Sequence, residues 1–219
     1  MTERPILFNA PMVRALLDGS KTQTRRLVKP QPTLDTNRWD VDAISTLWIG
    51  TGPSAATGGT RQTWGWSRCP YGKPGDRLWV REAIHLVPDQ EPDDGTGRVL
   101  SAYSADGVLT VADAWPWKRN NLPSMHCPRG LSRIDLEVTG VRVERLQDIS
   151  EADAKAEGSP ACARRVVGLN GGCDSYLCGY RQLWKQINGA GTWDANPWVW
   201  VIDFRKIGSP DYRVEGGFR

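Results

Sequence analysis

The chain of 219 residues contains no long apolar run. Its N-terminus lacks the basic start and the following apolar stretch that mark a signal peptide. No segment approaches the length that a membrane-spanning helix requires. We therefore expect a cytoplasmic protein that has no membrane partner.

The chain also lacks paired cysteine motifs. It has five cysteines, an odd number, and no C-x-x-C sequence, so we expect reduced thiols rather than a disulfide framework. Cys173 and Cys178, with Cys162 nearby, come closest to a metal-binding group. Their spacing fits no standard zinc pattern and a fourth ligand is missing. We expect neither a metal nor a cofactor.

A strong excess of one charge is missing as well. The net charge of +3 is too small to indicate nucleic-acid binding by itself. The distribution is more informative, because basic residues outnumber acidic ones over residues 1–30 and create a local field that suits an anionic ligand. The basic residues of this segment are Arg4, Arg14, Lys21, Arg25, Arg26 and Lys29, and the acidic ones are Glu3 and Asp18.

Tryptophan, in contrast, is abundant. The chain has eleven tryptophans, most of which we expect in the core or against loops because the indole ring carries a large apolar area. A minority are candidates for stacking on nucleic-acid bases. The tryptophans are residues 39, 48, 64, 66, 79, 115, 117, 184, 193, 198 and 200.

Apolar periodicity and turn residues predict short strands and a few helices. We expect α+β architecture, with the strands forming a small closed β-barrel flanked by short helices. The predicted strands are 5–8, 24–29, 77–82, 134–138, 141–144 and 198–204, with a hairpin at 100–104 and 108–112 and a kink or bulge near Gly140. The predicted helices are 11–18, 150–157 and 176–187, the last with Leu177, Tyr180, Leu183, Trp184 and Ile187 in the core. The start of the second is indicated by Ser150-Glu151-Ala152-Asp153, which resembles an N-capping pattern.

Residues 1–207 are predicted to form one domain with three loop insertions. The insertions are placed at about 30–68, 86–120 and 159–175, where Gly, Pro, Ser, Thr or acidic residues accumulate. Tryptophans 48, 64 and 66 are expected to pin the first insertion. Residues 208–219 are predicted to be a flexible tail.

The segment Gly19–Arg26, G-S-K-T-Q-T-R-R, concentrates polar functional groups where a helix ends. In a regular strand, Lys21 and Thr24 would face opposite sides, whereas on a turn they can converge as an amine–hydroxyl pair. The alternative interpretation is a solvated basic connector.

Five segments in order resemble the ASCH family. They are G-x-K-T-x-T-R-R, P-G-D-x-L-W-V-R-E, S-R-I-x-L-E-V, I-S-x-x-D-A-x-x-E-G and W-V-W-V-I-x-F, within residues 5–29, 69–83, 122–158 and 180–206. The set is most similar to phage and prophage ASCH proteins, which carry long insertions. The resemblance implies a PUA-like β-barrel that binds RNA or modified bases. For a phage-encoded protein, it implies location in the host cytoplasm.

One bacterial branch of this family hydrolyses N4-acetylcytidine, and its catalytic residues correspond to Lys21, Thr24 and Glu157. Our hypothesis is Thr24 as nucleophile, Lys21 as its activator and Glu157 as acid–base, with burial and the charges of Arg25 and Arg26 lowering the pKa of Lys21. Alternatively, Lys21 and Glu157 form a structural ion pair and Thr24 bonds to backbone.

Further candidate ligand-binding residues lie beside these. They are Thr22, Arg25, Arg26, Arg81, Glu82, His126, Arg129 and Arg133. Arg81 could reach a phosphate or a base edge, although an ion pair at the end of its strand is an equal alternative. His126 could contact a ligand or serve as a hydrogen-bonded loop histidine.

Three functions follow from these features. The first is a hydrolase acting on a modified nucleoside, with a free nucleoside as its partner. The second is a reader that binds RNA, single-stranded nucleic acid or modified DNA without catalysis. The third is a phage-encoded protein that binds a host protein through the tryptophan-rich insertion.

Overall fold

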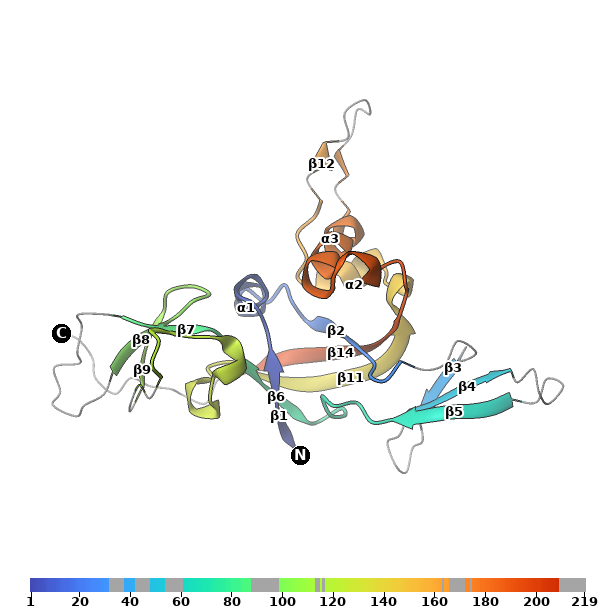
Figure 1. The fold of residues 1–219 in the computed structure, drawn as a ribbon, viewed down its shortest axis with the longest axis horizontal. Coiled ribbons are helices and arrows are strands. Elements are labelled where there is room, and N and C mark those ends of the chain that lie inside the picture. Colours follow the sequence, from blue (N-terminus) through green and yellow to red (C-terminus); the bar gives the residue numbers. More distant parts are fainter. Residues whose placement is uncertain are drawn as a thin grey trace. The chain divides into compact units, whose positions relative to one another are not determined.

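A computed structural model provides the structure of the chain (Figure 1). It describes residues 1–31, 38–41, 48–53, 61–87, 99–112, 115, 117–162, 164–165, 172–173 and 175–208. The predicted tail and much of the first and third insertions, including the side chains of the tryptophans at 48, 64 and 66, lie outside this description.

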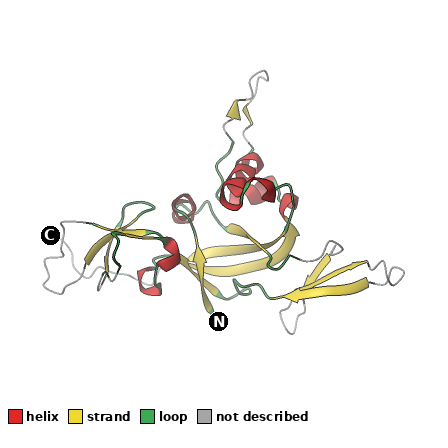
Figure 2. Cartoon of the chain, viewed as in Figure 1, coloured by secondary structure: helices red, strands yellow, loops and turns green. Residues whose placement is uncertain are grey.

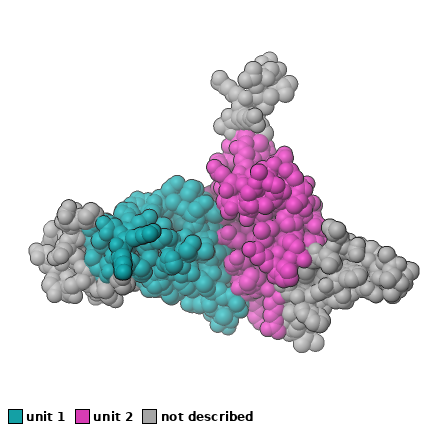
Figure 3. All heavy atoms as spheres, in the orientation of Figure 1, with its two compact units in different colours: residues 1–19, 76–137, 205–219 teal, residues 20–75, 138–204 magenta. Residues whose placement is uncertain are grey.

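The described chain is α+β and divides into two compact units (Figures 2 and 3). Unit 1 comprises residues 1–19, 76–137 and 205–219, and unit 2 comprises residues 20–75 and 138–204. The α+β class predicted from the sequence is confirmed. In the part of the chain that the structure covers, no helix is both long enough and apolar enough to cross a bilayer.

Unit 1 contains helix α1 and the beginning of the largest sheet. Strand β1 (Glu3–Leu7) pairs in parallel with β6 (Arg77–Arg81), and β6 pairs antiparallel with the start of β11 (Asp135–Arg145). Helix α1 (Ala10–Leu17) begins where Asn9 accepts a 3.0 Å hydrogen bond from the Met12 amide. It ends before Gly19, whose φ of +80° suits glycine.

A second sheet of unit 1 has the antiparallel order β10-β7-β8-β9. The pair β8 (Val99–Tyr103) and β9 (Leu109–Ala112) confirms the predicted hairpin. The other two strands are β7 (Ile84–Leu86) and β10 (Asn121–Leu122), and short 3₁₀ turns follow at Ser124–His126 and Arg129–Leu131. The core here consists of Ile84, Tyr103, Ala112, Cys127 and Leu131.

Unit 2 is built on β2 and β14. Strand β2 (Gln23–Leu27) pairs antiparallel with β14 (Trp198–Ile207), whose apolar residues are almost all buried. A core of mostly aromatic and aliphatic side chains forms here and includes two valines of β14. Its buried members are Leu146, Ile149, Ala154, Tyr180, Trp184, Trp193, Val199 and Val201.

Two helices of unit 2 begin at side-chain caps. Helix α2 (Glu151–Ala156) starts with a reciprocal capping box between Ser150 and Asp153, as the sequence predicted. Helix α3 (Tyr176–Asn188) is capped by Ser175. Tyr180 and Trp184 are buried as expected, but Ile187 is 49% exposed, so its assignment to the core was wrong.

The insertions contain regular strands, which corrects their description as loops. Strands β3 (Arg38–Val41), β4 (Trp48–Pro53) and β5 (Arg61–Ser67) form an antiparallel sheet within the first insertion. In the third, β12 (Arg164–Arg165) pairs with β13 (Gly172–Cys173). Threonine and tryptophan favour strands, while the abundant Gly and Pro of these segments concealed that preference in the sequence.

The largest sheet has the order β1-β6-β11-β14-β2. Among the described strands this order is open, since β1 and β2 are its end members, and the expected closed barrel is not formed. Strand β11 runs through Gly140 as one strand of 11 residues, so the predicted division into two strands was wrong. Gly140 does not interrupt the strand. It allows the backbone to approach the Asp203 side chain closely.

Candidate functional site

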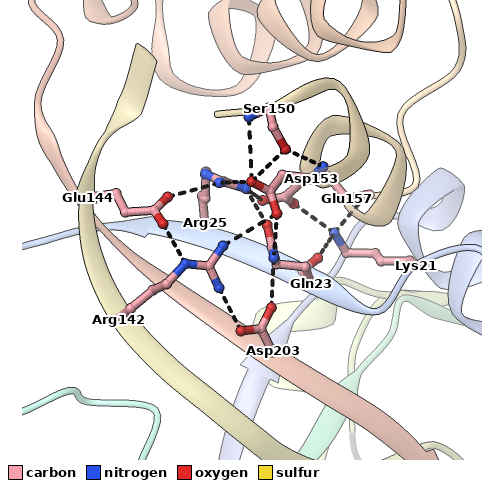
Figure 4. A network of polar contacts seen from close by, with 9 residues as sticks. All are labelled: Lys21, Gln23, Arg25, Arg142, Glu144, Ser150, Asp153, Glu157 and Asp203. Atoms are coloured by element: carbon pink, nitrogen blue, oxygen red, sulfur yellow. Dashed lines mark hydrogen bonds and ion pairs between the residues drawn. The ribbon is translucent and has the colours of Figure 1, made fainter. Parts of the chain in front are cut away.

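Strand β2 presents alternate side chains to two different surroundings. Gln23 and Arg25 project into a polar network of unit 2, shown in Figure 4. Since successive strand residues face opposite sides, Thr24 and Arg26 both project away from this network. Thr24 is 2% exposed in that position.

Lys21 lies at the buried base of the network. Its Nζ donates hydrogen bonds to the carbonyl oxygens of Gln23 and Glu157, both at 2.8 Å, and to Glu157 Oε2 at 3.0 Å. The Lys21 side chain is 0% exposed and that of Glu157 is 3% exposed. Burial lowers the pKa of Lys21, and the Glu157 carboxylate opposes this effect. Three acceptors around one nitrogen are the environment of an ammonium group.

Arg25 connects this base to the carboxylates above it. Its Nη1 donates to Gln23 Oε1 and lies 3.5 Å from Glu157 Oε1. Its Nη2 donates to Glu144 Oε2 at 3.1 Å and to Asp153 Oδ2 at 3.3 Å. The guanidinium is thereby held between β11 and α2, and the Arg25 side chain is 0% exposed.

Half-exposed charged residues form the outer part of the network, which we call the rim: Arg142, Glu144, Asp153 and Asp203. Arg142 donates to Glu144, to Asp203 Oδ2 at 2.6 Å and to Asp153 Oδ1 at 3.3 Å. Gln23 Nε2 donates to Asp203 Oδ1 at 2.6 Å and to Asp153 Oδ1 at 3.1 Å. The rim side chains are 25–35% exposed, so solvent and small solutes reach them.

These bonds maintain the charges of Asp153 and Arg142. Burial tends to raise the pKa of Asp153, but hydrogen bonds from Gln23 and Ser150, together with the charge of Arg25, lower it overall. For Arg142, burial acts to lower the pKa, and its bond to Glu144 raises it overall. The rim therefore presents fixed donors and fixed acceptors next to each other.

Of the residues predicted in unit 2, the structure brings Lys21, Arg25 and Glu157 together. Thr24 and Arg26 lie on the other face of β2, and Thr22 is exposed, with its amide bonded to Ala156 O at 2.8 Å. The expected convergence of Lys21 with Thr24 is not present, because regular alternation begins at Gln23.

The sequence reasoning missed Gln23, Arg142, Glu144 and Asp203. A signal for Asp203 was available, since it is the one charged residue within the apolar run Trp198–Phe204. A carboxylate at such a position requires a partner. Arg142 and Glu144 were recognised only as members of an alternating strand. Asp153 was recognised as a helix cap, and it serves the network as well.

The candidates predicted in unit 1 form a different cluster, centred on Arg133 and Glu82. Arg133 donates to both oxygens of Glu82, at 3.1 and 2.8 Å, and to both oxygens of Asp106, at 2.9 and 3.0 Å. Its guanidinium carbon lies 3.9 Å from the centre of the Tyr103 ring. Burial raises the pKa of Glu82 in spite of Arg133, and burial raises the pKa of Tyr103 to about 12.

The remaining unit 1 candidates have mixed surroundings. Arg81 Nε donates to Cys127 O at 3.0 Å, while Arg129 pairs with Asp135 at 3.0 Å and with Glu3 at 3.3 Å. His126 is exposed. The ion pair expected at the strand end forms between Glu82 and Arg133 rather than between Arg81 and Glu82.

Comparisons of the chain with protein-family models, with curated proteins and with solved structures find no match. Its function is therefore inferred from the chemistry of the site. Within the described residues, no group of three or more His, Cys, Asp or Glu side chains is arranged to hold a metal ion.

We expect Gly140→Ala to disturb the rim. A Cβ at residue 140 would lie 2.9 Å from Asp203 Oδ2, the atom that accepts from Arg142. The carboxylate must shift, and we expect the free energy of unfolding to fall by about 1 kcal/mol. Urea unfolding measures the change. Gly191→Ala is the control, since nothing lies within 4 Å of its added Cβ, and an equal effect of both changes would contradict this prediction.

Proposed function

We propose that the chain is an ASCH-family protein that binds a nucleobase at the rim of unit 2, either as a nucleoside or within single-stranded nucleic acid. The observation that carries the proposal is the rim itself. Half-exposed carboxylates and a guanidinium alternate there above a fully buried ion pair.

The chemistry of the rim suits the hydrogen-bonding edge of a base. Carboxylates such as Glu144 and Asp153 accept hydrogen bonds from exocyclic amino groups, as of cytosine or adenine. Arg142 donates to ring nitrogens or carbonyl oxygens. Bases in single strands or free nucleosides expose this edge, whereas duplexes conceal it.

The buried part of the network contributes by fixing the rim. Arg25 holds Glu144 and Asp153, and Gln23 holds Asp153 and Asp203. Groups that are already oriented lose little freedom when a ligand binds. The network therefore supports recognition of a specific pattern of donors and acceptors.

For the fold, we propose that residues 1–207 form one PUA-like ASCH domain with insertions. The ordered set of five motifs supports this assignment. The α+β composition is compatible with it, while the described strands form an open sheet instead of the closed barrel.

Binding is tested by titrating the protein with free nucleosides and with short single-stranded RNA, followed by calorimetry. We expect Arg142→Gln to weaken binding by about tenfold or more, because a bidentate contact with a base is lost. Arg181→Gln is the matched control, since Arg181 is 52% exposed on α3 and outside the network. If no nucleoside or RNA binds, or if both variants bind like the wild type, the proposal is wrong.

Hydrolysis of an N-acylated cytidine is the second candidate, favoured by the lowered pKa of Lys21 and its 3.0 Å contact with Glu157. The position of Thr24 on the opposite face of β2 favours simple binding instead. Chromatography of an incubation with N4-acetylcytidine decides between them. Turnover that is lost in both Lys21→Ala and Thr24→Ala supports hydrolysis, and absence of turnover or unchanged turnover in both contradicts it.

A further inference from the structure

Two cysteines of unit 2 lie around one side-chain amide. Gln182 Nε2 is 3.3 Å from Cys162 Sγ and 3.7 Å from Cys178 Sγ. Cys178 and Gln182 are one turn apart on α3, whereas Cys162 comes from the segment that follows α2. Tertiary packing thus brings both sulfurs to the same side-chain nitrogen.

Backbone contacts fix the position of the Cys162 segment. The Cys162 amide donates to Ser175 O at 3.1 Å, and this same carbonyl accepts from the Gly179 amide at 3.3 Å. Gly179 allows the approach, because a Cβ there would lie 1.9 Å from the Pro160 carbonyl oxygen. The segment therefore lies directly on the first turn of α3.

A small reagent can reach this place. A cavity of about 620 Å³ lies beside α3 and is lined by Pro160, Ala161, Cys162, Gly179, Gln182, Leu183 and Gln186. Cys178 is half-buried, and Cys162 is 6% exposed but lines the cavity. The Gln182 amide is positioned to donate to a thiolate, the nucleophilic form of cysteine.

We propose that Cys162 and Cys178 are a redox-sensitive pair that a peroxide converts to a disulfide. The thiolate of Cys178 attacks one peroxide oxygen, the O–O bond breaks, and the second oxygen leaves as water after protonation. The resulting sulfenic acid is attacked by the Cys162 thiolate, which forms the S–S bond and releases a second water. The two thiols lose two electrons and two protons, and the peroxide is reduced.

The test is treatment of the full chain with hydrogen peroxide, followed by alkylation, proteolysis and mass spectrometry. We expect a peptide that links residues 162 and 178 and has lost two hydrogen atoms. Closing this loop restricts the unfolded chain, so the melting temperature of the oxidised protein should be a few degrees higher. Addition of a thiol reductant should return the melting temperature to its original value. The measurement requires no nucleic-acid ligand and is independent of the function proposed above.

Variants separate this pair from the other cysteines. The structure does not describe the side chain of Cys173. The Cys173→Ser variant should retain the linked peptide, whereas the Cys178→Ser variant should abolish it. Gln182→Leu should slow the reaction severalfold if the amide stabilises the thiolate. Cys127→Ser is the control, because burial raises the pKa of Cys127 and its side chain is fully enclosed.

The contrary results are equally specific. Sulfinic acid at Cys178 without a linked peptide, or a disulfide only between two chains, would overturn the proposal. So would a linkage of either residue to Cys173 that replaces the predicted one in the wild-type protein.

Discussion

Glu157→Ala is expected to lower the free energy of unfolding by about 3 kcal/mol, because it leaves the buried Lys21 ammonium without its carboxylate. The Lys21 side chain is 0% exposed, so bulk solvent does not reach its ammonium group. Two carbonyl acceptors remain, which keeps the loss at the lower end of the usual range for such pairs. Chemical denaturation of the wild type and the variant measures the difference.

The loss should depend on pH in a defined direction. Burial already lowers the pKa of Lys21, and removing Glu157 lowers it further because the carboxylate raised it. The native state then binds fewer protons than the unfolded state below the ordinary pKa of 10.5, so stability rises with pH in that window. The deficit of Glu157→Ala should therefore be smaller at about pH 9 than at neutral pH.

Two further variants test the cause. Lys21→Met combined with Glu157→Leu should recover part of the stability, because no unpaired charge then remains buried. Asp194→Ala, at a carboxylate that is 62% exposed, should change little. A Glu157→Ala variant as stable as Asp194→Ala would contradict the buried ion pair.

Arg133→Met is expected to lower the free energy of unfolding by about 4 kcal/mol, since it strands the carboxylate of Glu82. That side chain is 1% exposed and receives both of its charged hydrogen bonds from Arg133. The stacking of the guanidinium on Tyr103 is lost as well. Thermal and chemical unfolding measure the effect.

The pH dependence of Arg133→Met should have the opposite sign to that of Glu157→Ala. Burial raises the pKa of Glu82, and removal of Arg133 raises it further because the guanidinium lowered it. The native state then binds more protons than the unfolded state, so stability falls as the pH rises above the ordinary pKa of 4.5. The deficit should shrink near about pH 5.

Asp106→Asn provides the matched control for this cluster. Asp106 also accepts two hydrogen bonds from Arg133, but its side chain is 24% exposed and water can replace it. Its substitution should cost far less than that of Arg133. Equal losses for the two variants would show that burial of Glu82 does not govern the stability of the cluster.

Local signals predicted most elements of the fold. The helix at 150–157 was identified from Ser150 and Asp153, which form the capping box that begins α2, and Gly158 follows with φ of +72°. These signals depend on neighbouring residues only, so they are visible in the sequence. The strands of the first insertion were missed because glycine and proline are scattered among its strand-favouring threonines and tryptophans.

The candidate site was predicted only in part. Lys21, Arg25 and Glu157 were chosen, and they do meet, but the carboxylates that complete the site were not identified. Asp203 and Gln23 are 180 residues apart, and their contact depends on the pairing of β2 with β14. Such register cannot be derived from either strand alone.

By itself, the sequence determined the three helices and the main strands outside the insertions, that the chain is α+β, and that polar and basic side chains gather at Lys21–Arg26. Only the tertiary structure decided that Lys21 pairs with Glu157, 136 residues away, and that Thr24 faces the other side of β2. The physical reason is the same in each case. Propensity and capping act between neighbours, whereas burial, strand register and the pairing of charges are properties of residues that only the folded chain brings together.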